Sequence, residues 1–149
     1  MKTVKIKYTG KSEIPKRQTL GSAGYDVHAN LIFEKKVYEE LKIAPFQLVF
    51  IPTGIHLEIP IGYECQIRAR SSLCKKNLMF ANGIGTIDSD YRGEIFIPLR
   101  NLSNRISVIK HGERIVQLVF NRVELPVLQE VSELSDTERG QSGFGSTGE

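Results

Sequence analysis

The segment at residues 82–94 carries the residue types best suited to chemistry in this chain. Gly83 and Gly85 bracket one apolar residue, and two carboxylates, Asp88 and Asp90, follow them. A glycine-rich hairpin can present backbone donors and acceptors in a narrow slot, with a carboxylate at its rim. Because side chains two positions apart share one face of a strand, the two carboxylates could also hold a metal ion. An ordinary acidic turn has the same spacing, so the pattern alone leaves these alternatives open.

Two further clusters could contact an anion. Residues 68–72 read Arg-Ala-Arg-Ser-Ser, which is typical of a strand that runs into a short helix with a serine N-cap. Such a junction directs hydroxyls, backbone N–H groups and the fork-shaped guanidinium of Arg70 toward one place. A serine cap beside a solvated arginine is the simpler alternative. The other cluster, residues 112–118, reads Gly-Glu-Arg-Ile-Val-Gln-Leu and also fits a turn followed by a core strand.

The last eleven residues, 139–149, combine one arginine and one phenylalanine with four of the chain's 13 glycines. This composition fits a frayed terminus. It also fits an arm that becomes ordered over a ligand, because glycine backbones approach phosphates closely and successive N–H groups bind anions.

The histidines and cysteines do not support nucleophilic or metal chemistry. His28, His56 and His111 lack the spacing of metal ligands, and no motif pairs a histidine with a serine or cysteine. Cys65 and Cys74 have no second pair, which excludes a disulfide scaffold and a zinc knuckle.

The elements that must position these clusters are short strands. Apolar and polar residues alternate at positions 4–8 and 55–59, as in half-buried strands. Further strands are predicted at residues 25–29, 46–51, 64–69, 94–99, 106–109 and 114–120, separated by glycine and proline turns. A short helix is predicted after the two serines, at residues 73–77, and a helical turn at residues 38–41. Many short strands with such punctuation indicate an all-β sandwich, jelly roll or barrel.

Length and charge further restrict the class of protein. The chain has 149 residues, close to one domain of roughly 150 residues. Its net charge of +3 is too small for a surface that wraps nucleic acid, and 40% apolar residues suit a folded globule. No apolar run approaches the roughly 20 residues of a membrane span, and the first residues are too polar for a signal peptide. We therefore expect a soluble, cytoplasmic protein.

Five segments, taken in order, resemble the five motifs of the trimeric dUTPase family. They are Ala-Gly-Tyr-Asp-Val at residues 23–27, Arg-Ser-Ser at 70–72, Gly-Thr-Ile-Asp-Ser-Asp-Tyr-Arg-Gly-Glu at 85–94, the 112–118 cluster, and residues 139–148. The resemblance spans residues 21–148, and its third and fifth segments are the most specific.

The resemblance implies a distorted jelly roll, or β-clip, of short strands with one short helix. It also implies a homotrimer with active sites between subunits, in which residues 1–138 form the β domain and residues 139–149 form a flexible arm. Family members hydrolyse dUTP to dUMP and pyrophosphate, which keeps uracil out of DNA and supplies dUMP for dTTP synthesis. Mg²⁺ is bound through the substrate phosphates, with no direct protein ligand.

The resemblance also implies a role for individual residues. Asp88 would orient and deprotonate the attacking water, Tyr91 would lie against the deoxyribose, and Asp26 would organise neighbouring side chains. The residues expected to read uracil are Asn82, Thr86, Ile87 and Phe96. Those expected to bind phosphates are Arg70, Ser71, Ser72 and Gln117. In the arm, Phe144 would stack on uracil, Arg139 would reach the γ-phosphate, and Gly145, Ser146 and Thr147 would wrap the phosphates.

Two other functions compete with this interpretation. One is a dCTP deaminase, or a bifunctional deaminase and dUTPase, on the same fold; ammonia release from dCTP would reveal it. The other is a non-catalytic trimer that binds a nucleotide or a protein, which predicts affinity without phosphate release. Nucleic acid and membrane are not expected partners, since the charge is modest and no aromatic platform is evident.

Overall fold

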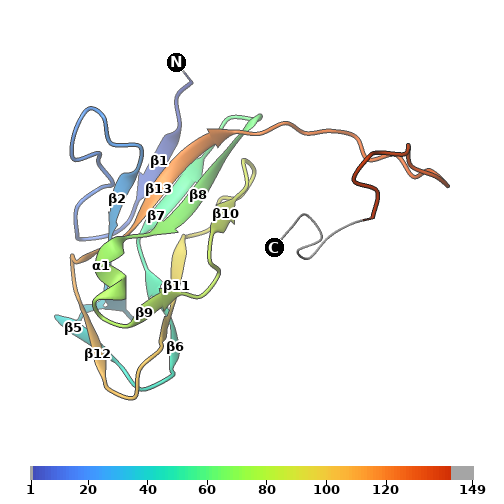
Figure 1. The fold of residues 1–149 in the computed structure, drawn as a ribbon. Coiled ribbons are helices and arrows are strands. Elements are labelled where there is room, and N and C mark those ends of the chain that lie inside the picture. Colours follow the sequence, from blue (N-terminus) through green and yellow to red (C-terminus); the bar gives the residue numbers. More distant parts are fainter. Residues whose placement is uncertain (1, 142–149) are drawn as a thin grey trace.

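The computed structural model describes residues 2–141, and nearly all of their regular structure is β-strand (Figure 1). The strands are β1 (Lys5–Tyr8), β2 (Tyr25–His28), β3 (Ile32–Phe33), β4 (Lys36–Val37), β5 (Glu40–Ile43), β6 (Leu48–Pro52), β7 (Ile55–Glu58), β8 (Tyr63–Ala69), β9 (Leu78–Phe80), β10 (Gly85–Ile87), β11 (Phe96–Asn101), β12 (Ser107–Lys110) and β13 (Arg114–Arg122). The only helix of the described residues is α1 (Ser71–Cys74), directly after β8. The prediction of an all-β chain with one short helix is confirmed.

The strands pair antiparallel in several small sheets. The largest has the order β10-β8-β13-β2, and a second has the order β6-β11-β9. The remaining pairs are β1 with β7, β5 with β12, and β3 with β4. In Figure 1, β8 and β13 run side by side, while β6 and β12 lie toward the opposite end of the molecule. The described residues contain no helix that is long and apolar enough to cross a membrane.

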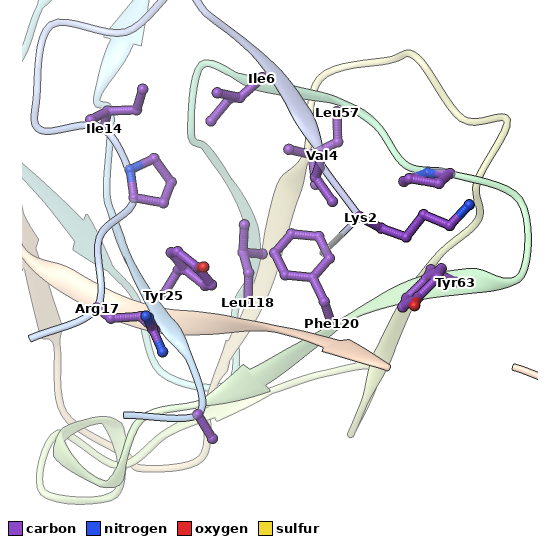
Figure 2. Close-up of a pocket in the computed structure, with 13 residues that line it drawn as sticks. Lys2, Val4, Ile6, Ile14, Arg17, Tyr25, Leu57, Tyr63, Leu118 and Phe120 are labelled. Atoms are coloured by element: carbon purple, nitrogen blue, oxygen red, sulfur yellow. The ribbon is translucent and has the colours of Figure 1, made fainter. Parts of the chain in front are cut away.

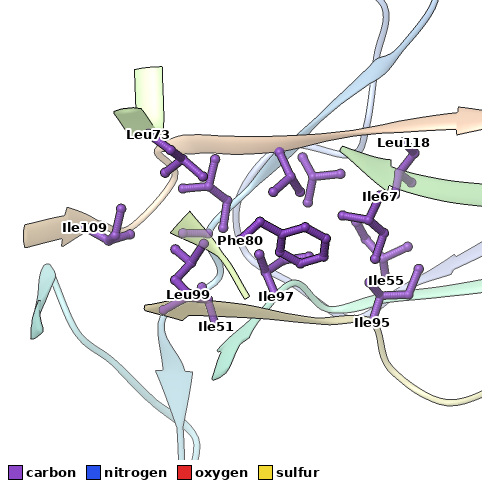
Figure 3. Packing of buried hydrophobic residues seen from close by; sticks show 14 of the residues in the cluster. Ile51, Ile55, Ile67, Leu73, Phe80, Ile95, Ile97, Leu99, Ile109 and Leu118 are labelled. Atoms are coloured by element: carbon purple, nitrogen blue, oxygen red, sulfur yellow. The ribbon is translucent and has the colours of Figure 1, made fainter. Parts of the chain in front are cut away.

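One hydrophobic core joins these sheets. In β7, the buried Ile55 and Leu57 alternate with more exposed neighbours, and in β11, Ile97 to Leu99 are all buried. Figure 3 shows the ring of Phe80 among these buried side chains. Each buried aliphatic side chain stabilises the fold by about 1.5–3 kcal/mol. The period-two pattern at residues 55–58 therefore follows from the burial of one face of β7.

Two local predictions are wrong. Residues 38–41 do not form a helical turn, because Leu41 and its neighbours in β5 pair with Ile109 and the rest of β12. The helix begins two residues earlier than predicted, and its N-cap is Arg70, whose backbone is extended and whose side chain makes no capping bond. Ser71 and Ser72 thus lie inside the first turn rather than at the cap. The chain turns at Asn77, which adopts a φ of 54°.

Candidate active site

A pocket of about 280 Å³ lies between β10, with the loop that follows it, and strands β6 and β11. Its lining combines aromatic, polar and acidic side chains. Six of its residues were predicted to bind the substrate: Asn82, Thr86, Ile87, Asp88, Tyr91 and Phe96. The structure therefore brings the predicted base and sugar residues together around the predicted catalytic carboxylate.

Strand β10 offers backbone groups to this pocket. It is an edge strand of its sheet, and among the described strands it pairs with β8 alone. The free side of an edge strand presents unpaired N–H and C=O groups. Such groups can hydrogen-bond to a planar heterocycle in the way a neighbouring strand would. Residues 82–94 do not form the predicted hairpin, because β10 pairs with β8 while β11, the next strand along the chain, pairs with β6 and β9.

Asp88 follows β10 directly and is exposed to the pocket. Within residues 2–141, its carboxylate makes no hydrogen bond or ion pair, so both oxygens remain available to a ligand or a water molecule. The other carboxylate of the pocket, Glu94, is engaged. Its Oε1 accepts hydrogen bonds from the backbone N–H groups of Thr53 at 3.2 Å and Gly54 at 2.7 Å. Asp88 is therefore the carboxylate that can act on a reacting group.

Of the two carboxylates that could share one strand face, Asp88 lines the pocket and Asp90 does not. Nowhere in the described part of the chain do three or more His, Cys, Asp or Glu side chains group so that they could hold a metal ion. A magnesium ion in this site would need oxygen ligands from elsewhere, such as the phosphates of a nucleotide.

A second polar cluster surrounds Asp26 on β2. The Asp26 carboxylate is 6% exposed and accepts hydrogen bonds from Arg70 and, at 3.2 Å, from Arg114. Gln117 lies on β13 opposite Asp26, with its side chain over Gly24. Ser71 and Ser72 follow Arg70 in α1. The residues predicted to bind phosphates thus gather with Asp26, and Arg114 joins them although the sequence did not single it out.

Asp88 and Arg70 lie toward opposite ends of β8. Asp88 follows Ile87, which pairs with Cys65 near the start of the strand, whereas Arg70 directly follows its last residue. At about 3.3 Å per residue, the five residues from Cys65 to Arg70 span about 17 Å. One chain therefore does not bring Asp88 and Arg70 to the same place.

The remaining predicted residues belong to the C-terminal segment. Arg139 lies beyond β13, in a turn where the Gly140 N–H donates to the Thr137 carbonyl at 3.0 Å. In Figure 1 the chain after β13 runs away from the sheets. Phe144, Gly145, Ser146 and Thr147 lie outside the described residues.

A larger apolar groove of about 520 Å³ contains none of the predicted site residues. Figure 2 shows Leu118 and Phe120 of β13 facing Val4 and Ile6 across this groove. Tyr25 and Tyr63 also line it. The groove lacks the carboxylate and the open strand edge of the smaller pocket, so size alone does not identify the site.

Residues that the sequence did not single out also line the pocket: Phe50, Ile95 and Pro98, together with Glu94, which was quoted only as part of a motif. Phe50 comes from β6, which pairs with β11 through the Phe50–Pro98 register. Phe50 is 59% exposed, between the half-buried Val49 and the buried Ile51. The sequence shows only a run of apolar residues at this place, which does not reveal which side chain faces the pocket.

Comparison with known proteins identifies the class as nucleotide-hydrolysing enzymes. The family model described as dUTPase matches residues 10–148. The deoxyuridine 5'-triphosphate nucleotidohydrolase of Fusobacterium nucleatum is 44% identical over 99% of both chains, and that of Finegoldia magna is 43% identical over 97% of this chain and 99% of its own. The chain belongs to the dUTPase family.

Solved structures agree with this assignment. The structure of Staphylococcus bacteriophage 80alpha dUTPase with dUpNHpp is 28% identical, covers 99% of both chains and has a TM-score of 0.81. A mutant of the same phage dUTPase, also with dUpNHpp, has a TM-score of 0.84. These neighbours confirm the jelly-roll-like fold that the resemblance implied.

Proposed function

We propose that this protein hydrolyses dUTP to dUMP and pyrophosphate. The observation that carries the proposal is the pocket that joins the open edge of β10, the aromatic rings of Tyr91 and Phe96, and the carboxylate of Asp88, which has no partner among the described residues. Membership of the dUTPase family supports it. The product dUMP would feed dTTP synthesis, and removal of dUTP would keep uracil out of DNA.

The pocket would select the base by hydrogen bonding and by shape. The backbone of Thr86 and Ile87, with the side chain of Asn82, would pair with the edge of uracil. Cytosine exchanges a donor for an acceptor on that edge, which leaves buried polar groups unpaired. The methyl group of thymine would collide with a rigid slot. The Tyr91 ring would lie where a ribose 2'-hydroxyl would have to fit, which disfavours UTP.

Asp88 would hold the attacking water and accept its proton as the oxygen bonds to the α-phosphorus. The bond from that phosphorus to the bridging oxygen breaks, and pyrophosphate leaves with the bonding electrons. Arg70, Ser71, Ser72 and Gln117 would hold the phosphate oxygens. Mg²⁺, carried on the phosphates, would neutralise part of their charge and favour a geometry open to attack.

The separation of Asp88 from Arg70 supports a site shared between subunits, as in the homotrimer that the resemblance implies. Since Asp88 and Arg70 lie at opposite ends of β8, a complete site needs Arg70 from one subunit beside the Asp88 pocket of another. The outer face of the β6-β11-β9 sheet exposes apolar side chains next to that pocket: Leu48, Phe50, Met79 and Phe96. The arm at residues 139–149, with Arg139, Phe144, Gly145, Ser146 and Thr147, would close over the assembled site and exclude water.

The direct test is pyrophosphate release from dUTP, compared with dTTP, dCTP and UTP, in the presence of magnesium. We expect release from dUTP and at least a hundredfold lower kcat/KM for the other three. Equal cleavage of all four nucleotides, or no cleavage of dUTP, contradicts the proposal. Ammonia release from dCTP would instead indicate a deaminase. Sedimentation equilibrium should give three times the monomer mass of 16.8 kDa.

A further inference from the structure

Gly93 has no side chain, and this leaves room for the ring of Tyr91. A Cβ at position 93 would lie 2.3 Å from Tyr91 Oη, 2.5 Å from Cζ and 3.0 Å from Cε2. Ordinary van der Waals contact begins near 3.4 Å, so the ring would have to move by about 1 Å. The backbone at Gly93 is not in the left-handed region, and an alanine could adopt it. Glycine is thus needed here for space and not for backbone conformation.

Glu94 fixes the hydroxyl end of the same ring. Tyr91 Oη donates a hydrogen bond to the Glu94 carbonyl oxygen at 3.1 Å. Glu94 is in turn held by the Thr53 and Gly54 N–H groups, which donate to its carboxylate. The Thr53 hydroxyl also donates to the carbonyl oxygen of the next residue, Ile95, at 2.6 Å. The acceptor of the tyrosine hydroxyl is therefore anchored to the turn between β6 and β7.

Arg92 fixes the backbone on the other side of Tyr91. Its Nη1 donates to the carbonyl oxygens of Ser89 at 2.8 Å and Tyr91 at 3.0 Å. The Tyr91 N–H donates to the Asp88 carbonyl at 3.3 Å. The position of the ring is thus tied at its backbone to Asp88 and at its hydroxyl to Glu94.

We propose that Gly93 and Glu94 are positioning residues. By holding the Tyr91 ring in place, they set the discrimination between deoxyribose and ribose. The inference rests on the proposed function, in which the Tyr91 ring excludes a 2'-hydroxyl. A side chain at position 93 pushes the ring off its acceptor and away from the sugar. The space that opens then admits the extra hydroxyl of UTP, while the base-reading edge of β10 and the Asp88 carboxylate stay in place.

The test is the ratio of kcat/KM for dUTP to kcat/KM for UTP in Gly93→Ala. We expect the ratio to fall at least tenfold, mainly because UTP becomes a better substrate. Gly21→Ala is the matched control: Gly21 also lies outside the left-handed region, and a Cβ there meets no atom within 4 Å. Its ratio should equal that of the unmodified protein.

A double-mutant cycle separates ring displacement from general damage. In a Tyr91→Ala background, Gly93→Ala should leave the ratio unchanged, because the group it displaces is gone. If Gly93→Ala does not fold, Tyr91→Phe tests the same contact, since it removes only the hydroxyl bonded to Glu94. That variant should lower the ratio about threefold.

The outcomes distinguish this inference from the proposed function. A parent protein that does not cleave dUTP, or cleaves UTP equally well, overturns the proposed function. If the parent protein is selective for dUTP and Gly93→Ala leaves the ratio unchanged, only the inference is overturned. The same holds if Gly93→Ala lowers the ratio equally in the Tyr91→Ala background. If only Tyr91→Phe can be measured, an unchanged ratio overturns the inference.

Discussion

Arg70 donates a hydrogen bond to the carboxylate of Asp26, although 44 residues separate them in the chain. β13 lies between β8, which Arg70 follows, and β2, which carries Asp26. The carboxylate is 6% exposed and also accepts a hydrogen bond from Arg114, so it holds two guanidinium groups in fixed positions. A guanidinium fixed in this way is prepared to bind phosphate oxygens with little further loss of side-chain freedom.

Asp26→Asn should weaken both the fold and phosphate binding. Removing one partner of a fully buried ion pair costs roughly 3–5 kcal/mol. We expect a decrease of about 2 kcal/mol in the free energy of unfolding, because Arg70 and Arg114 keep 28% and 45% exposure. Urea denaturation measures this change, and KM for dUTP should rise. Glu58→Gln, which breaks an exposed ion pair with Lys5, is the control and should alter neither. An unchanged KM in Asp26→Asn would show that Arg70 needs no positioning.

Asp88→Asn should abolish turnover and preserve binding. An amide keeps the shape of the side chain but cannot accept the proton of the attacking water, so kcat should fall by about 10²–10⁴. The dissociation constant of a non-hydrolysable dUTP analogue, measured by calorimetry, should stay within about threefold. Asp90→Asn is the matched control, since Asp90 is also an exposed carboxylate of the same loop but does not line the pocket. Equal loss of turnover in both variants would contradict the assignment of Asp88 as the base.

The longer strands could be predicted from the sequence because their signal is local. In β7, burial alternates from Ile55 to Glu58, and hydropathy follows burial. β3 and β4 have two residues each, too few to display a period, so no hydropathy pattern predicts them. For residues 38–41, local preference was a poor guide because the partner strand β12 decides the structure.

The lining residues of the pocket could be predicted where one continuous segment supplies them. Residues 82–91 provide Asn82, Thr86, Asp88 and Tyr91 from a continuous stretch that resembles a family motif. Phe50 comes from a distant strand, and only the β6–β11 register places it there. The separation of Arg70 from Asp88 could not be inferred from motif order, because it depends on the direction in which β10 pairs with β8.

Gly24→Ala should disturb Gln117 without changing the backbone of β2. A Cβ at position 24 would lie 2.3 Å from Gln117 Oε1 and 2.9 Å from Cδ, and Gly24 is not in the left-handed region. The amide must therefore turn away from its present place. If Gln117 binds the α-phosphate, kcat/KM for dUTP should fall about tenfold or more, and Gln117→Ala should give a similar loss. The double variant should be no worse than either single one, since both remove the same contact. Additive losses would show that Gly24 acts by another route.

His28 should make stability depend on pH below neutrality. His28 is 8% exposed, and its Nδ1 has no hydrogen-bond partner among the described residues. Burial lowers the pKa of His28 below its ordinary value of 6.5; the charge of Arg114 adds to this, while Glu13 and Asp26 oppose it. The unfolded chain therefore binds a proton near pH 6.5 while the folded chain stays neutral. Stability from this group is complete above pH 6.5 and decreases as the pH falls toward the lower pKa of the folded state.

His28→Gln isolates this effect, because glutamine has no proton to gain over this range. We expect the urea midpoint of the unmodified protein to fall more steeply between pH 7.5 and pH 5.5 than that of His28→Gln. Above pH 7.5 the two curves should run parallel, since neither side chain titrates there, whatever the difference in absolute stability. Comparing slopes rather than midpoints also cancels the contribution of the carboxylates, which both proteins share. Parallel curves down to pH 5.5 would mean that protonated His28 is accommodated in the folded protein as readily as in the unfolded chain.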